Sequence, residues 1–142
     1  MTINAGVLHP EVHRTCWATE PPIFVEETLC TVRARVGQLA DGKDLWWPLE
    51  SPGIWDDVRE KVTRYVLPFL DKMHAINAME QFLIDLQVTR QSYPPPAIYL
   101  AILMNERGDK SGACALLSEL RTRTTGVWKT RIGEVYERLN CN

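Results

Sequence analysis

The chain has 142 residues and a net charge of −2, with 45% hydrophobic and 24% charged residues. These proportions are those of a folded globular protein and exclude a disordered chain. The weak charge gives no basis for general nucleic-acid or membrane-surface binding, and no apolar run approaches the roughly 20 residues of a membrane helix. The first residues lack the basic and apolar regions of a signal peptide. We therefore expect one cytoplasmic domain over residues 1–142, with no nucleic-acid or membrane partner.

Two segments near the start of the chain alternate apolar and polar residues, which is the period of a half-buried β-strand. The first is Thr2–Leu8 and the second is Cys30–Gly37, in which the apolar side chains share one face. Residues 11–27, between them, are expected to be irregular, and the apolar run Ile23–Val25 is either a third strand or a packed loop. A turn at Asp41–Gly42 follows the second strand.

The rest of the chain has helical periodicity, because apolar residues recur at spacings of three and four. Ser51 and Pro52 favour a helix start, and the apolar stripe behind them, which includes Trp55, Val62 and Phe69, is expected to face the sheet. Pro68 either kinks this helix or ends it. Further helices are expected at about residues 77–87, at 97–106 in the centre of the fold, after Asp109, and at 126–139.

The order of these elements, strands first and helices after, predicts an α+β fold. A small N-terminal antiparallel sheet within residues 1–49 is expected to be covered by about five C-terminal helices within residues 50–142. The two portions are expected to form a single domain, since a chain of this length fits one hydrophobic core.

The cysteines Cys16, Cys30, Cys114 and Cys141 are widely scattered and lack the spacing of a closed zinc site. In the cytoplasm we expect them to be thiols, with Cys30 and Cys114 buried as small hydrophobic residues. His9, His13 and Cys16 lie close together, but Pro10 stands between the histidines and no fourth ligand is evident. We therefore interpret this stretch as a solvated loop and expect no metal and no cofactor.

No catalytic motif is recognisable, and no glycine-rich phosphate loop exists. Asp56 and Asp57 stand where negative charge offsets the dipole of the first long helix, which is a structural role. Arg33 and Arg35 alternate outward on the second strand. They are either solvated surface charges or a grip for a phosphate or carboxylate group.

The pair Trp46–Trp47 is the best candidate for a partner-binding site. Adjacent side chains of an extended chain point to opposite faces, so only one tryptophan can lie in the core under the first long helix. Acidic residues outnumber basic ones between Glu20 and Glu60, which favours a basic protein partner. The alternative is that both tryptophans pack internally, one on each side of the sheet. The candidate partner-binding residues are Trp46, Trp47, Asp41, Asp44, Asp56, Asp57, Arg33 and Arg35.

Four stretches together resemble a bacterial family catalogued as domain of unknown function 4304. They are the opening TINAGV strand, Cys30 with the VRARVGQL run, the DLWWPL segment, and LPFLD at Leu67–Asp71. Members of that family are associated with an extra helix and β-hairpin ahead of the TINAGV strand. Without them the edge of Thr2–Leu8 would be open to a partner or to a homodimer. None of these motifs is catalytic.

The resemblance implies by analogy a non-enzymatic, toxin-neutralising immunity protein. The alternative is a small enzyme or ligand-binding domain with a pocket between the sheet and the helices.

Overall fold

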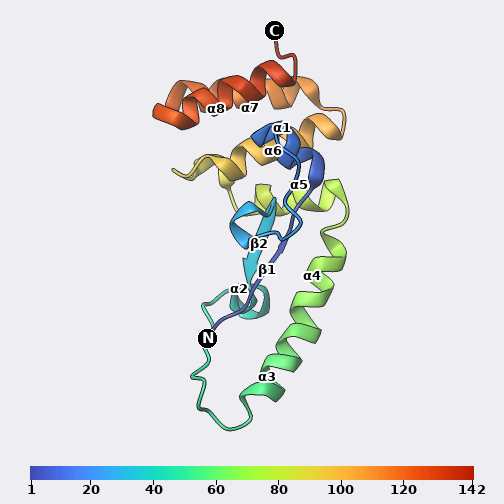
Figure 1. Cartoon of the computed structure of the whole chain (residues 1–142), viewed down its shortest axis with the longest axis vertical. Coiled ribbons are helices and arrows are strands. Elements are labelled where there is room, and N and C mark those ends of the chain that lie inside the picture. Colours follow the sequence, from blue (N-terminus) through green and yellow to red (C-terminus); the bar gives the residue numbers. More distant parts are fainter.

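The computed structural model describes all residues, 1–142, and confirms the α+β fold. It has a two-stranded sheet and several helices, none with the length and apolar character that a membrane span needs. The molecule is elongated, with α7, α8 and the C-terminus at one end and the loop between α2 and α3 at the other (Figure 1). The elements are β1 (Asn4–Val7), α1 (Pro10–Trp17), β2 (Val32–Arg35), α2 (Val36–Asp41), α3 (Ile54–Lys61), α4 (Leu67–Lys72), α5 (Ile76–Asp85), α6 (Pro95–Glu106), α7 (Lys110–Arg123) and α8 (Gly126–Arg138).

The sheet consists of the two expected strands, paired antiparallel with Ala5 opposite Ala34. The second strand is shorter than expected, because it ends at Arg35 and α2 begins at the next residue. The Gln38 side chain stabilises the start of α2 by accepting a hydrogen bond from the Arg35 N–H at 3.0 Å. Gly37 permits it, since a Cβ atom there would collide with the main chain of Lys43. No third strand covers the outer edge of β1.

Residues 10–17 form the helix α1, so the expectation of an irregular segment from residue 11 is wrong there. Pro10 occupies the first turn, where a missing N–H costs nothing. The helix is only eight residues long, too short for a clear periodicity, and its stability comes from packing of Val12, His13 and Cys16 in the interior. The segment interpreted as a solvated loop therefore lies in a helix with two of its three candidate ligands buried.

Helices α3 and α4 form one long rod, joined through a π turn at Val62–Val66. The Leu67 N–H bonds to the Val62 carbonyl, five residues back, directly before Pro68. This turn lets the helix continue through the proline. Phe69 is buried as expected, but Trp55 is 63% exposed, so the expectation that the whole stripe faces the sheet is wrong. The α3 half extends beyond the sheet, as Figure 1 shows, and only the α4 half packs against β1.

Helix α6 is the centre of the helical end and is buried around most of its circumference, as expected. It packs against α5, α7 and α1. Asp109 caps α7 as expected, because its carboxylate accepts a hydrogen bond from the Gly112 N–H at 2.9 Å. An ion pair between Glu80 of α5 and Arg107, at the end of α6, ties the two helices together at 2.6 Å.

Cys114 and Cys141 form a disulfide, so the expectation of four free thiols is wrong. Helix α8 runs back along α7 and brings the tail beside it, with the two Cα atoms 5.4 Å apart. That distance is within the range of a disulfide. The cysteines are 27 residues apart, and no local spacing pattern announces the pairing. Cys30 is free and buried as expected, and Cys16 is also free and buried.

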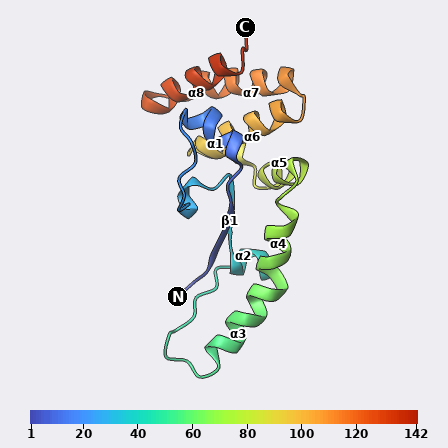
Figure 2. The ribbon, with the colours of Figure 1, turned by 45° about the vertical axis from the view of Figure 1, so that its right-hand side comes forward.

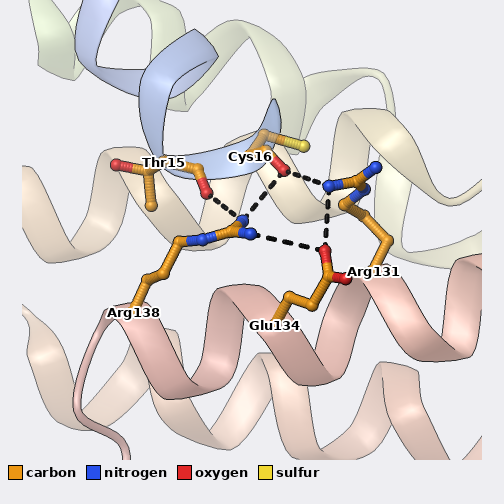
Figure 3. A network of polar contacts seen from close by, with 5 residues as sticks. All are labelled: Thr15, Cys16, Arg131, Glu134 and Arg138. Atoms are coloured by element: carbon orange, nitrogen blue, oxygen red, sulfur yellow. Dashed lines mark hydrogen bonds and ion pairs between the residues drawn. The ribbon is translucent and has the colours of Figure 1, made fainter. Parts of the chain in front are cut away.

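Helix α1 is clamped to α8 by two arginines. The Arg138 guanidinium donates to the carbonyls of Thr15 and Cys16 at 2.8 and 3.2 Å, and Arg131 donates to the Cys16 carbonyl at 3.3 Å. Glu134 accepts from both arginines (Figure 3). The positive charges stand at the C-terminus of α1, where they satisfy its last carbonyls and complement its dipole. Figure 2 shows α1 beneath α8 and beside α6.

Candidate binding surfaces

Three groups that form no ion pair, Cys16, Cys30 and Tyr99, have raised pKa values, which favour their protonated forms. Burial raises the pKa of the Cys16 thiol to about 12, and it also raises the pKa values of Cys30 and Tyr99. A thiol becomes a nucleophile only as a thiolate, so these shifts work against covalent chemistry. No three His, Cys, Asp or Glu side chains are grouped so that they could hold a metal ion.

The two tryptophans of the pair point in different directions, as the sequence predicts. Trp47 is only 6% exposed, and its indole N–H donates to the Asp57 carboxylate at 2.6 Å. Its main chain also exchanges hydrogen bonds with Met1. The pKa of Asp57 is lowered first by the Trp47 hydrogen bond and then by Lys61. Trp47 and Asp57 thus hold the loop onto α3 and present little to a partner.

Trp46 is 58% exposed, yet its ring is held in place. The Arg35 guanidinium lies over the ring, with its Cζ atom 5.7 Å from the ring centroid. Asp44 holds the same guanidinium, since both carboxylate oxygens accept from Arg35 Nη1 at 2.9 Å. A planar guanidinium between a carboxylate and an indole favours one orientation of each. Arg35, Asp44 and Trp46 therefore form one preorganised cluster.

Further exposed apolar and acidic side chains follow Trp46 along the loop that leads into α3. Leu49 and Trp55 are more than half exposed. This loop lies at the end of the molecule opposite the C-terminus (Figure 1). Asp41, Glu50 and Asp56 are exposed and form no ion pair, whereas Asp44 and Asp57 are paired with Arg35 and Lys61. We call this part of the molecule the tryptophan end; it comprises Trp46, Leu49, Glu50, Trp55 and Asp56 of the loop and helix start, together with Asp41 at the end of α2.

A second candidate surface is a groove of about 540 Å³ beside β2. Its walls come from β2, α2, the end of α5 and the segment that leads into α6. The apolar lining includes Leu83, Leu86, Val88, Tyr93 and Tyr99, and Arg33 is the only charged residue in it. Arg33 and Arg35 lie on the same face of β2, as the sequence predicts, but only Arg33 lines this groove, whereas Arg35 pairs with Asp44.

The main chain of Arg33 is also available at this groove. Val36 donates its N–H to the Ile3 carbonyl, and Ala34 stands opposite Ala5. Hydrogen-bonding direction alternates along an antiparallel strand, so the N–H and C=O of Arg33 point away from β1. On this side of β2 the Arg35 N–H is already bound to Gln38, so the N–H and C=O of Arg33 are the unpaired groups that an added chain could meet.

Residues 1–72 match the family described as Domain of unknown function (DUF4304). The chain belongs to the DUF4304 family. No curated protein and no solved structure matches the chain.

The DUF4304 match ends at the last residue of α4. The tryptophan end lies wholly within the DUF4304 region, and so do the four stretches that suggested the family. The groove is formed partly by the DUF4304 region and partly by the rest of the chain, because β2 and α2 belong to that region whereas α5 and the start of α6 do not. The sequence suggested a pocket between the sheet and the helices as an alternative but could not locate it, because its walls are about 50 residues apart in sequence and each wall alone has the pattern of an ordinary core.

Proposed function

We propose that this chain is a non-enzymatic protein-binding domain that contacts its partner through the tryptophan end. The observation that carries the proposal is the state of Trp46, which is exposed but fixed by Arg35 and Asp44. Because the Trp46 ring is already fixed, its burial by a partner costs little side-chain entropy. Tryptophans buried in interfaces are frequent hot spots of binding energy. Leu49 and Trp55 extend the apolar contact on the same loop and helix start.

The partner that suits this surface is a protein with a basic rim. The unpaired carboxylates of Asp41, Glu50 and Asp56 surround the apolar residues in the sequence, and such charges raise the rate of association with a positive surface. The specific form that we propose is a bacterial immunity protein that neutralises a toxin domain in the cytoplasm. This step rests on analogy with small intracellular inhibitors.

The experiment is affinity capture from the native host, followed by titration of the purified partner. Trp46→Ala should weaken binding by about 2 kcal/mol or more, while the free energy of unfolding changes little. Val127→Ala is the matched control, because Val127 is also exposed and apolar but lies on α8 at the opposite end. A partner that binds Trp46→Ala as tightly as the wild type would contradict the proposal.

The groove supports a second candidate function, the binding of a small ligand. An apolar lining with one cation suits a molecule with an apolar body and one negative charge. Catalysis is less well supported, because the one thiol in the lining, Cys30, has a raised pKa. A thermal-shift screen with such compounds tests this function, and an increase in Tm that disappears in Arg33→Ala would favour it.

A further inference from the structure

The segment Pro21–Glu27 carries the most exposed apolar side chains of the molecule. Ile23 is 95% exposed and Phe24 is 89% exposed, and Val25 is also exposed. The segment is therefore neither the third strand nor the packed loop that the sequence suggested. A single exposed apolar residue is ordinary, but three in succession on an outward loop indicate a surface that another molecule covers.

The segment has the composition of a ligand for an apolar groove that carries a cation. Pro21 and Pro22 restrict the backbone before the bend at Ile23 and Phe24, and Glu26 after the bend is extended, with φ −72° and ψ 146°. The three apolar residues are followed directly by two acidic ones, Glu26 and Glu27, and neither forms an ion pair within the chain. A segment of this type would dock in an apolar groove that also offers a cation and main-chain groups without a hydrogen-bond partner.

The groove beside β2 offers all three of these features. Leu86 and Tyr93 on its rim are about half exposed, so they gain from being covered. Arg33 supplies the cation and, unlike Arg35, has no carboxylate partner. Its N–H and C=O face away from β1 and are free to pair with an added chain.

We propose that the occupant of the groove is a second copy of this chain, whose Pro21–Glu27 segment docks beside β2. The segment leads directly into Thr28 and Cys30, which line the groove of its own chain. In the proposed dimer a two-fold axis lies beside the groove, so that each segment enters the groove of the other copy and the exchange is reciprocal. Ile23 and Phe24 enter the apolar lining, and Glu26 pairs with Arg33 of the other copy. This inference is independent of partner binding at the tryptophan end, because no apolar residue of that surface lines the groove, but the second copy would compete for the groove with a small ligand.

Sedimentation equilibrium on the whole chain tests the dimer. The wild type is expected to dimerise at micromolar concentration. A segment variant (Ile23→Ser with Phe24→Ser) and a groove variant (Leu86→Asp) should each raise the dimer dissociation constant at least about tenfold. All of these side chains are exposed in the single chain, so the fold should persist, and circular dichroism checks it. Tyr93→Ser is a second groove variant, and Val127→Ser is the control that should dimerise as the wild type does.

Mixing the two variants gives the sharpest readout. The segment variant retains an intact groove, and the groove variant retains an intact segment. A mixed dimer therefore keeps one of the two docking contacts, whereas each variant alone keeps none. The mixture should associate more tightly than either variant alone. A charge exchange is a further check, because Glu26→Arg and Arg33→Glu should each weaken the dimer and recover part of the affinity when combined.

The proposal is overturned by a wild type that stays monomeric up to about 1 mM, or by a dimer that both variants leave intact. A dimer that persists in Leu86→Asp but is lost in Asn4→Pro would assign the contact to the outer edge of β1, and this outcome also rejects the groove. Partner binding through Trp46 is measured separately with the monomeric segment variant. Failure of the dimer therefore does not count against partner binding at the tryptophan end. Failure of partner binding at Trp46 likewise does not count against the dimer.

Discussion

At the scale of single residues, the contrast between Trp46 and Trp47 is decided by which hydrogen-bond partner each ring can reach. The Trp47 indole N–H is buried, and a buried donor must be paired. Asp57, in the first turn of α3, supplies the acceptor. Trp46 faces outward and meets a cation instead, so its ring is held without being covered. One tryptophan therefore stabilises the fold, and its neighbour is left to contact a partner.

The lowered pKa of Asp57 predicts a stability that depends on pH. Its folded-state pKa lies below the ordinary value of 3.8, because the charged form accepts from Trp47 and Lys61. The carboxylate therefore stabilises the fold above pH 3.8, and this contribution is lost as the pH falls through the lowered pKa. Asp57→Asn should be less stable than the wild type at pH 7. The difference in unfolding free energy should become smaller as the pH is lowered below 3.8.

Urea unfolding at each pH measures this difference. Asp56→Asn is the matched control, since Asp56 lies in the same helical turn but has no partner. It reports the helix-dipole effect alone. An Asp57→Asn variant whose loss of stability is the same at every pH would show that the Trp47 contact does not depend on the charge.

At the scale of elements, the rod formed by α3 and α4 has two different halves. The α4 half packs on the sheet and on α5, where Phe69 meets Phe82 with ring centroids 5.3 Å apart. The α3 half is anchored by Ile54 and by the Trp47–Asp57 contact, while Trp55 is exposed. The π turn between the halves lies directly before Pro68. The same apolar periodicity thus serves the core in one half and the surface in the other.

This division predicts opposite outcomes for two large-to-small substitutions on one rod. Phe69→Ala should cost about 3–5 kcal/mol of unfolding free energy, from the lost transfer energy and the cavity left behind. Trp55→Ala should cost less than about 1 kcal/mol, because its ring is mostly in water. Denaturant melts measure both values. Similar losses for the two variants would mean that the α3 half packs against something that the single chain does not contain.

At the scale of the whole molecule, the helical end is joined to the N-terminal part by contacts between residues far apart in sequence. Helix α8 holds the carbonyl end of α1 through Arg131 and Arg138, more than 110 residues away. The disulfide in turn ties the tail behind α8 to α7. The arginine clamp thus joins the DUF4304 region to helices outside it.

Removal of the disulfide should therefore loosen the helical end. Replacing Cys114 and Cys141, which are 27 residues apart, with Ser should cost about 3.5 kcal/mol, the chain-entropy value for a closed loop of this length. Protection from hydrogen exchange should fall first in α8, and the tryptophan end should keep its protection. Cys30→Ser is the control for a buried cysteine outside the disulfide. A double variant with wild-type stability and exchange would show that packing alone holds the tail.

Local patterns in the sequence were sufficient for much of the fold. Alternation located both strands, three-and-four spacing located the long rod and the helices behind it, and the Asp109 cap located the start of α7. These features depend on residues only a few positions apart, so they can be predicted from a single amino-acid sequence. The separation of the tryptophan pair also followed from the geometry of extended chain.

The tertiary structure alone decided which of these surfaces are covered. Helix α1 is too short to show a period, and its stability comes from α6 and α8. Trp55 has the spacing of a core residue but lies on a half of the rod that extends beyond the sheet. The groove and the disulfide each join segments about 27 to 50 residues apart, and no local pattern encodes a contact over that distance. Burial depends on what packs opposite a residue, and only the folded chain determines that.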